Sequence, residues 1–286
     1  MKRGIALTVA VLLLGGVVLV LTSPVPPKPE EPRGPREAGS LAAVVTSASG
    51  PGHEDGGEST GDFSPGGPTG SIVGRVFAVH AAPEPAIPIQ RTGANYPYFD
   101  RYFPPCGPYH ETGAVVVSSK DGALANAVVY LKGPKAPPGW PPAGGTYAID
   151  QRACHFLPRV LLVPAGRAVT FSNGDSVLHE VKATSTANDS FAHGVPANGT
   201  LEHVFEKPEF VGLGCSLHPF MGGVVVVQAH PWYALTDEKG AFRLDGVPAG
   251  RRKLVCWHER LKQAQPDGVV VTVQAAATTE QDIHYR

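Results

Sequence analysis

Beyond residue 70 the chain is a succession of short apolar runs separated by turn-forming residues. Its 286 residues include 34 glycines and 29 prolines, and few apolar residues recur at helical spacing, so short strands are favoured over helices. Turn-forming pairs lie between several runs, at Asp121-Gly122, Asn173-Gly174 and Asn198-Gly199. The spacing predicts an all-β protein built as a β-sandwich. The predicted strands are Ile72–Val79, Ala114–Ser118, Ala127–Leu131, Val160–Val163, Ala168–Phe171, Leu178–Val181, Leu201–Phe205, Val211–Gly214, Val224–Val227, Phe242–Leu244, Lys253–Trp257 and Val269–Val273.

A proline- and glycine-rich break interrupts this pattern between Gly133 and Gly145. Neither a helix nor a central strand tolerates so many prolines. We therefore expect a linker over residues 134–145, followed by a compact domain over residues 146–230.

A cysteine, a histidine and a methionine lie within seven residues, at Cys215, His218 and Met221, and a second histidine, His179, lies upstream. A thiolate, two imidazoles and a weak thioether are the ligand set of a mononuclear electron-transfer copper site. Zinc could occupy a Cys-His-His set, but the methionine is less natural for zinc. Because the chain has only two methionines and the other is the initiator, the four residues together favour one copper ion.

Other functional classes find little support in the sequence. The net charge is -1 with no basic patch, which gives no reason to expect a nucleic-acid partner. The chain has no His-x-His pair of the kind that multicopper oxidases need, and no nucleophile elbow, P-loop or His-Glu-x-x-His motif. We expect no catalytic residues and no enzyme activity.

The stretch from Phe171 to Val181, Phe205-Glu-Lys-Pro and the segment from Cys215 to Met221 together resemble the cupredoxin family, in particular its amicyanin- and plastocyanin-like members. The resemblance implies a Greek-key β-sandwich holding one type 1 copper. His179, Cys215 and His218 would form the trigonal plane, and Met221 would be the weak axial ligand. One position departs from the family pattern: Glu180 follows the first histidine, where the family commonly has an asparagine that ties the ligand loops together.

The segments on either side of this domain resemble the two halves of a carboxypeptidase regulatory-like module, a second small β-sandwich. Residues 71–133 would be its first half and residues 231–286 its second, with the copper domain inserted between them. The alternative is one continuous sandwich followed by a separate tail.

Four cysteines in an exported chain would ordinarily suggest two disulfides. If Cys215 is a metal ligand, three remain, and Cys106 and Cys154 are the preferred pair, since both lie just before strand-like runs on the same side of the copper motif. Cys256 alternates with apolar neighbours and is interpreted as a buried thiol.

The first 23 residues have the features of an export segment. Lys2 and Arg3 precede a stretch from Gly4 to Leu21 without any charge, long enough to cross a bilayer. No A-x-A-like site precedes Pro24, so an uncleaved anchor with its charged end inside is favoured over a cleaved signal. Residues 24–70 are polar and rich in proline and glycine, and predict a disordered linker.

Together these features predict an extracytoplasmic, membrane-tethered blue-copper protein that carries single electrons between an exported donor and an exported acceptor. An apolar patch lined by Pro219 and Phe220, beside His218, would dock these redox partners. Two alternatives stay open: a structural or carbohydrate-binding β module with a cupredoxin-like fold, and a protein for copper sequestration or delivery.

Overall fold

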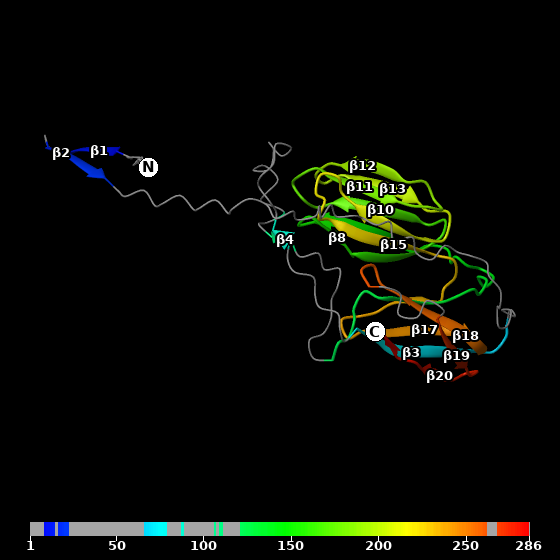
Figure 1. Cartoon of the computed structure of the whole chain (residues 1–286). Helices are drawn as coiled ribbons and strands as arrows, with labels where there is room; N and C mark the ends of the chain where they lie inside the picture. Colours follow the sequence, from blue (N-terminus) through cyan, green and yellow to red (C-terminus); the bar gives the residue numbers. More distant parts are fainter. Residues whose placement is uncertain are drawn as a thin grey trace, which may run out of the picture. The chain divides into compact units, whose positions relative to one another are not determined.

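The computed structural model describes residues 9–14, 17–22, 66–78, 87–88, 106, 109–110, 121–261 and 268–285. Every named element is a β-strand, so the predicted all-β class is confirmed (Figure 1). The chain divides into two compact units, Met1–Ala42 and Ala43–Arg286.

The first unit contains two strands, β1 (Val9–Leu14) and β2 (Val17–Thr22). They pair in antiparallel fashion, with Val9 opposite Thr22. The described residues therefore show two strands within the stretch for which a single membrane-crossing segment was expected. None of them belongs to a helix that is long and apolar enough to cross a membrane. The predicted linker up to residue 65 and the predicted strand Ala114–Ser118 lie outside the described residues.

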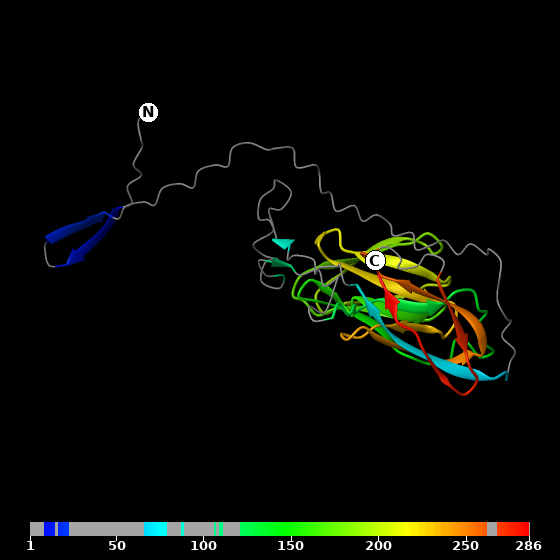
Figure 2. The same cartoon turned by 60° about the horizontal axis from the view of Figure 1, so that its bottom comes forward.

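Two sheets pack against each other around one apolar core and form a central sandwich, whose strands are green to yellow in Figure 2. One sheet has the order β13 (Thr200–Val204), β10 (Ala168–Asn173), β7 (Tyr147–Arg152), β8 (His155–Leu157). The other has the order β12 (Phe191–Val195), β11 (His179–Thr184), β14 (Glu209–Gly214), β15 (Gly222–Gln228), β9 (Val160–Pro164). The core between them is aromatic and aliphatic, with Phe156, Phe171, Phe205 and Ile149 fully buried. Side chains alternate across β11, which turns His179 inward beside this core.

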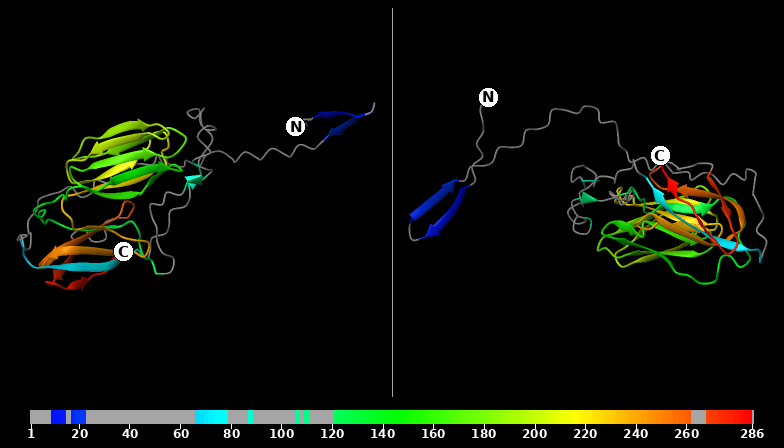
Figure 3. Two further views of the ribbon diagram at one scale, coloured as in Figure 1. Left: turned by 180° about the vertical axis from the view of Figure 1, so that it is seen from behind. Right: turned by 90° about the horizontal axis from the view of Figure 1, so that it is seen from below.

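The flanking segments pair with each other and form a second pair of sheets. One sheet has the order β16 (Tyr233–Leu235), β6 (Val128–Leu131), β18 (Gly250–Trp257), β19 (Val269–Val273). The other has the order β17 (Ala241–Pro248), β3 (Thr69–Phe77), β20 (Thr278–Glu280), and β21 (Ile283–His284) also pairs with β3. Figure 3 shows cyan β3 beside the orange and red strands from the other end of the chain. Strands before and after the central sandwich therefore share the same sheets, while their likeness to a carboxypeptidase regulatory-like module stays a prediction. Two short strands, β4 (Ile87–Pro88) and β5 (Tyr109–His110), pair separately.

A third apolar cluster joins the two sandwiches. Val128 and Trp257 from the flanking strands pack with Val160, Val224 and Val226 from the central sandwich. The ring of Phe210 lies 4.5 Å from that of Trp257, measured between centroids. Burial of these side chains removes apolar surface of both sandwiches from water, which stabilises their contact.

One ion pair accompanies this apolar contact. Arg159 Nε lies 2.5 Å from Glu259 Oε1, and both side chains are mostly buried. Arg159 Nη1 also donates to the carbonyl oxygen of Gly222, which directly follows Met221. The ion pair therefore connects the flanking sandwich to the end of the predicted ligand loop.

Candidate metal centre

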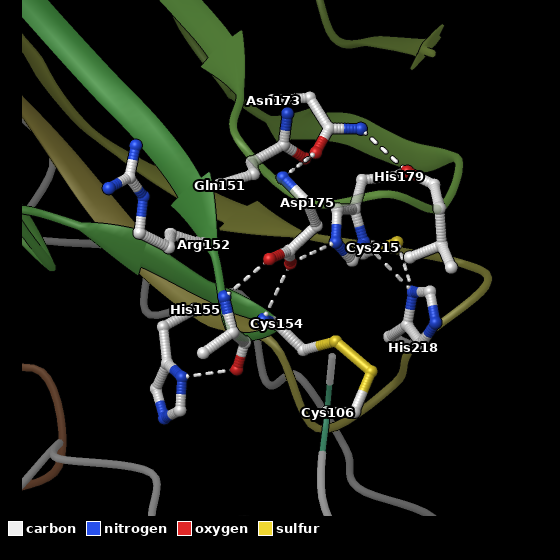
Figure 4. Close-up of polar contacts among 12 residues, drawn as sticks. Cys106, Gln151, Arg152, Cys154, His155, Asn173, Asp175, His179, Cys215 and His218 are labelled. Carbon is white, nitrogen blue, oxygen red and sulfur yellow. Dashed lines mark hydrogen bonds and ion pairs between the residues drawn. A yellow bond between two sulfur atoms is a disulfide. The ribbon is translucent and has the colours of Figure 1, made fainter. Parts of the chain in front are cut away.

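Three of the four predicted ligands converge at one end of the five-stranded sheet. His179 is the first residue of β11, Cys215 directly follows β14, and His218 lies in the loop before β15. The ligand atoms of the three side chains all lie within 4.8 Å of one another. The Nδ1 atoms of the two histidines are 3.1 Å apart, and Cys215 Sγ is 3.6 Å from His218 Nδ1 (Figure 4).

All three side chains are almost inaccessible to water, with exposed fractions of 0 % for His179, 4 % for Cys215 and 5 % for His218. Met221 is buried as well, in the same core cluster as Cys215. Its N–H donates to the carbonyl oxygen of His218 at 2.9 Å, which closes the loop into a tight turn. Met221 thus lies on the ligand loop and is buried in the same apolar core as Cys215.

Burial decides the protonation of the two donors from this loop. It raises the pKa of the Cys215 thiol, against the opposing effect of the nearby N–H groups of Glu180, His218 and Leu217. It also lowers the pKa of His218 to about 4, and the neighbouring His179 contributes to the same effect. His218 is therefore neutral near pH 7 and can offer a lone pair, while a bound cation would draw the proton from the thiol.

An aspartate that the sequence analysis missed holds the first histidine. Asp175 is buried, and its Oδ2 lies 2.8 Å from His179 Nε2. Because a carboxylate only accepts, His179 carries its proton on Nε2 and leaves Nδ1 free to bind a metal. The signal is the strand-and-turn pattern from Phe171 to Asp175, which precedes the histidine and also contains its partner.

Asn173 shapes the loop that carries this aspartate. Its Nδ2 donates to the carbonyl oxygens of Val177 and Val195, each at 2.8 Å, and its Oδ1 accepts from the N–H of Asp175 at 3.0 Å. The sequence had indicated only a turn at this position. The buried amide of Asn173 instead fixes the approach of Asp175 to His179.

Glu180 connects the two ligand-bearing segments. Its N–H points to Cys215 Sγ at 3.3 Å, and its Oε1 accepts from the N–H of Ser216 at 3.2 Å. The glutamate therefore ties the strand of the first histidine to the cysteine loop, so the departure from the expected asparagine leaves the loops joined.

The predicted disulfide between Cys106 and Cys154 is present. Cys256 is a buried free thiol, as predicted, and burial raises its pKa to about 12. The Cys106 and Cys154 sulfurs and a ring nitrogen of His218 all lie within 4.8 Å of one another. No feature of the sequence indicated that the disulfide would lie beside a candidate ligand.

The donor set suits copper. One soft thiolate and two imidazoles face each other in a buried site, and a thioether-bearing residue follows on the same loop. The backbone N–H directed at the thiolate and the carboxylate on His179 are the kind of outer partners that orient ligands and adjust a metal's properties.

No family model matches the chain, and no curated protein matches it. Among solved structures, a purple cupredoxin from Nitrosopumilus maritimus aligns with 28 % identity over 29 % of this chain and 99 % of its own, with a TM-score of 0.26. A reduced amicyanin variant aligns with 21 % identity over 35 % of this chain and 98 % of its own, with a TM-score of 0.28. A copper-containing nitrite reductase from Thermus scotoductus aligns with 23 % identity over 29 % of this chain, with a TM-score of 0.28, and the matched part spans only 22 % of that enzyme.

Proposed function

We propose that this protein is an exported one-electron carrier that holds a single copper ion of type 1. The supporting observation is the convergence of the Cys215 sulfur with ring nitrogens of His179 and His218 in a water-excluded site. Met221, from the same loop, would be the weak axial ligand. Bound copper would supply one-electron exchange between Cu(II) and Cu(I).

The residues around the ligands limit rearrangement when the charge of the site changes. Asp175 holds the ring of His179, and Glu180 holds the cysteine loop through Ser216. His218 and Met221 are joined by a backbone hydrogen bond. A site whose donors are held in place needs little reorganisation between oxidation states, and this favours fast transfer of an electron.

Apolar side chains at the rim of the site suit short-lived docking of redox partners. Leu178 precedes the first histidine and Leu217 the second, and they are 42 % and 41 % exposed. Pro219 is exposed and Phe220 partly exposed, next to His218 on the ligand loop. A small apolar face of this kind fits weak, rapidly exchanging complexes with an exported electron donor and acceptor.

Export is proposed from the charge-free stretch after Lys2 and Arg3, and it agrees with the disulfide, which persists outside the reducing cytoplasm. Attachment to a membrane through residues 4–21 is the further proposal. Fractionation of the mature protein and sequencing of its N-terminus test it, since a soluble form starting near residue 24 would show a cleaved signal.

Addition of Cu(II) to the full-length, metal-free protein tests the proposed function. We expect an intense thiolate-to-copper charge-transfer band, and reversible one-electron voltammetry. Cys215→Ala should abolish both the band and tight binding, because the thiolate supplies the most covalent bond. A variant that keeps the band would contradict the assignment. Absence of any band in the unaltered protein would favour a structural or carbohydrate-binding module, and tight Cu(I) binding without reversible voltammetry would favour copper storage or delivery.

A further inference from the structure

The disulfide beside the candidate copper ligands forms part of two further groups of donor atoms. The Cys106 and Cys154 sulfurs group with a ring nitrogen of His218, and the Cys154 sulfur also groups with atoms of Asp175 and His179. In each group the atoms lie within 4.8 Å of one another, and all five side chains are buried. Figure 4 shows the disulfide next to the two histidine rings.

Contacts other than the disulfide hold Cys154 in this position. Ala153 and Cys154 form the turn between β7 and β8 with left-handed φ angles of 49° and 59°. Their N–H groups donate to the two oxygens of Asp175, at 2.7 and 2.9 Å. The same carboxylate is bonded to His179, so one buried group fixes both the cysteine turn and the copper ligand. None of these hydrogen bonds involves a sulfur atom, so we expect them to persist when the S–S bond is cleaved.

We propose that the Cys106–Cys154 disulfide masks a second metal site, which opens when an exported dithiol reduces it. The two released thiols and His218 would then form a soft site of two sulfurs and one nitrogen, suited to Cu(I). The inference rests on the proposed function in so far as it shares His218 with the copper site.

The reduction is an ordinary thiol–disulfide exchange. Cys106 is 9 % exposed and Cys154 is fully buried, so the reductant's thiolate attacks the Cys106 sulfur and Cys154 leaves as the thiolate. The second thiol of the reductant then displaces Cys106 and closes the reductant's own disulfide. Two electrons and two protons pass from the dithiol to the protein, and metal binding afterwards releases the thiol protons.

The two sites cannot both use His218. An ion held by Cys106 and Cys154 withdraws this imidazole from Cys215 and His179, so reduction converts an electron-transfer site into a Cu(I)-holding site. The thiol–disulfide state would thereby decide whether the protein exchanges electrons or retains its metal.

The test uses the full-length Cys215→Ser variant, which lacks the thiolate of the proposed copper site. Its affinity for Cu(I) is measured by competition with a Cu(I) chelator, without oxygen, before and after reduction by dithiothreitol and removal of that reagent. We expect reduction to raise the affinity at least about tenfold, the scale on which ligands and their partners change metal binding. Equal affinities in the two forms would overturn the proposal.

Two matched variants in the same background identify the donors. Cys106→Ser with Cys154→Ser should remove the gain on reduction, and His218→Ala should weaken it while keeping both thiols. Cys256 is present in every form, so its thiol cancels in the comparison. A gain that survives the double serine change, or one that His218→Ala leaves undiminished, would contradict the proposed ligands. Loss of the aromatic bands of the near-ultraviolet circular dichroism on reduction would do so as well, because Asp175 would then not suffice to hold the turn.

The proposed function is tested separately, with the oxidised unaltered protein and Cu(II). If no charge-transfer band appears, the Cu(I) affinities of the Cys215→Ser variant can still be compared. If those affinities are equal before and after reduction, the charge-transfer band of the oxidised protein is unaffected. The two failures are therefore distinguishable.

Discussion

Two carboxylates support the candidate ligands: Asp175 holds the first histidine, and Glu180 joins the strand of that histidine to the cysteine loop. Asp175 accepts from His179 Nε2, and Glu180 accepts from Ser216 beside the cysteine. Neither carboxylate is a proposed ligand. Both place a carboxylate close to the donor atoms and orient the segments that carry them, so residues that are not ligands themselves help to shape the candidate metal site.

Asp175→Asn tests the first of these roles. An amide oxygen can still accept from His179 Nε2, but it lacks the charge that makes the imidazole a better donor to Cu(II). We expect Cu(II) to bind about tenfold more weakly with Cu(I) less affected, which raises the reduction potential by up to about 59 mV for a one-electron couple. Asp150→Asn is the matched control, because Asp150 bonds to Ser172 and Arg152 instead of a ligand. An unchanged potential in the Asp175 variant would show that this carboxylate is only structural.

Met221→Leu tests the proposed axial ligand. Leucine is apolar and similar in size, so the buried loop should keep its packing and copper should remain bound. Loss of a weak axial donor disfavours Cu(II), and we expect the reduction potential measured by voltammetry to rise. A fall in potential, or loss of the metal, would show that Met221 has another role.

At the scale of elements, Glu209 at the start of β14 organises the loop between β11 and β12. Burial raises the pKa of its carboxyl, but hydrogen bonds from Ser185, Thr186 and Asn188 outweigh this and lower the pKa to about 2. The carboxylate also accepts from the N–H of Ala187 at 3.1 Å. One charged side chain thus satisfies several donors of a loop that leads away from the ligand strand.

This carboxylate should make stability depend on pH. Its pKa is lower in the folded protein than the ordinary 4.5, so the unfolded chain binds more protons in this range, and the stabilisation is present above about pH 4.5 and lost as the pH falls toward 2. We expect Glu209→Gln to reduce the pH dependence of the free energy of unfolding across this interval. The measurement is urea unfolding of the metal-free protein at a series of pH values. Ser185→Ala, which removes one donor, should have an intermediate effect. A pH profile unchanged in the Glu209 variant would exclude this contribution.

At the scale of the whole molecule, the flanking sandwich is built from both sides of the central one. β6 pairs with β16 and β18, and β3 pairs with β17. Residues separated by more than a hundred positions are therefore neighbours in one sheet. The ion pair of Arg159 with Glu259 and the cluster around Trp257 connect the flanking sandwich to the central sandwich.

Truncation after Val227 should consequently unfold the N-terminal flank. β3 and β6 would lose their partners and expose their apolar faces, whereas the strands of the central sandwich keep theirs. We expect amide protons of β3 and β6 to lose protection from exchange, with a smaller effect on the copper charge-transfer band. Glu259→Gln, which removes the ion pair and keeps the strands, should preserve that protection. Full protection of β3 in the truncated chain would contradict this interdependence.

The sequence by itself determined the class of fold and the candidate ligands. Strands show in the alternation of apolar runs and turns, which are local features, and Cys215, His218 and Met221 are recognisable because a single short loop carries them. The strands it missed, such as β12 and β20, are short elements with largely exposed side chains, so their sequences carry little apolar pattern.

Only the tertiary structure decided which residues support the site. Glu180 reaches Ser216, and the disulfide comes to lie beside His218, through contacts between segments that the chain order leaves apart. Asp175 lies only four residues before His179, and it reaches the histidine through a turn that the buried Asn173 amide holds in place. A pairing such as Cys106 with Cys154 could be proposed from the sequence, but its place next to a ligand could not. The reason is physical: residue type and local spacing determine what a side chain can bind, whereas long-range packing determines what it meets.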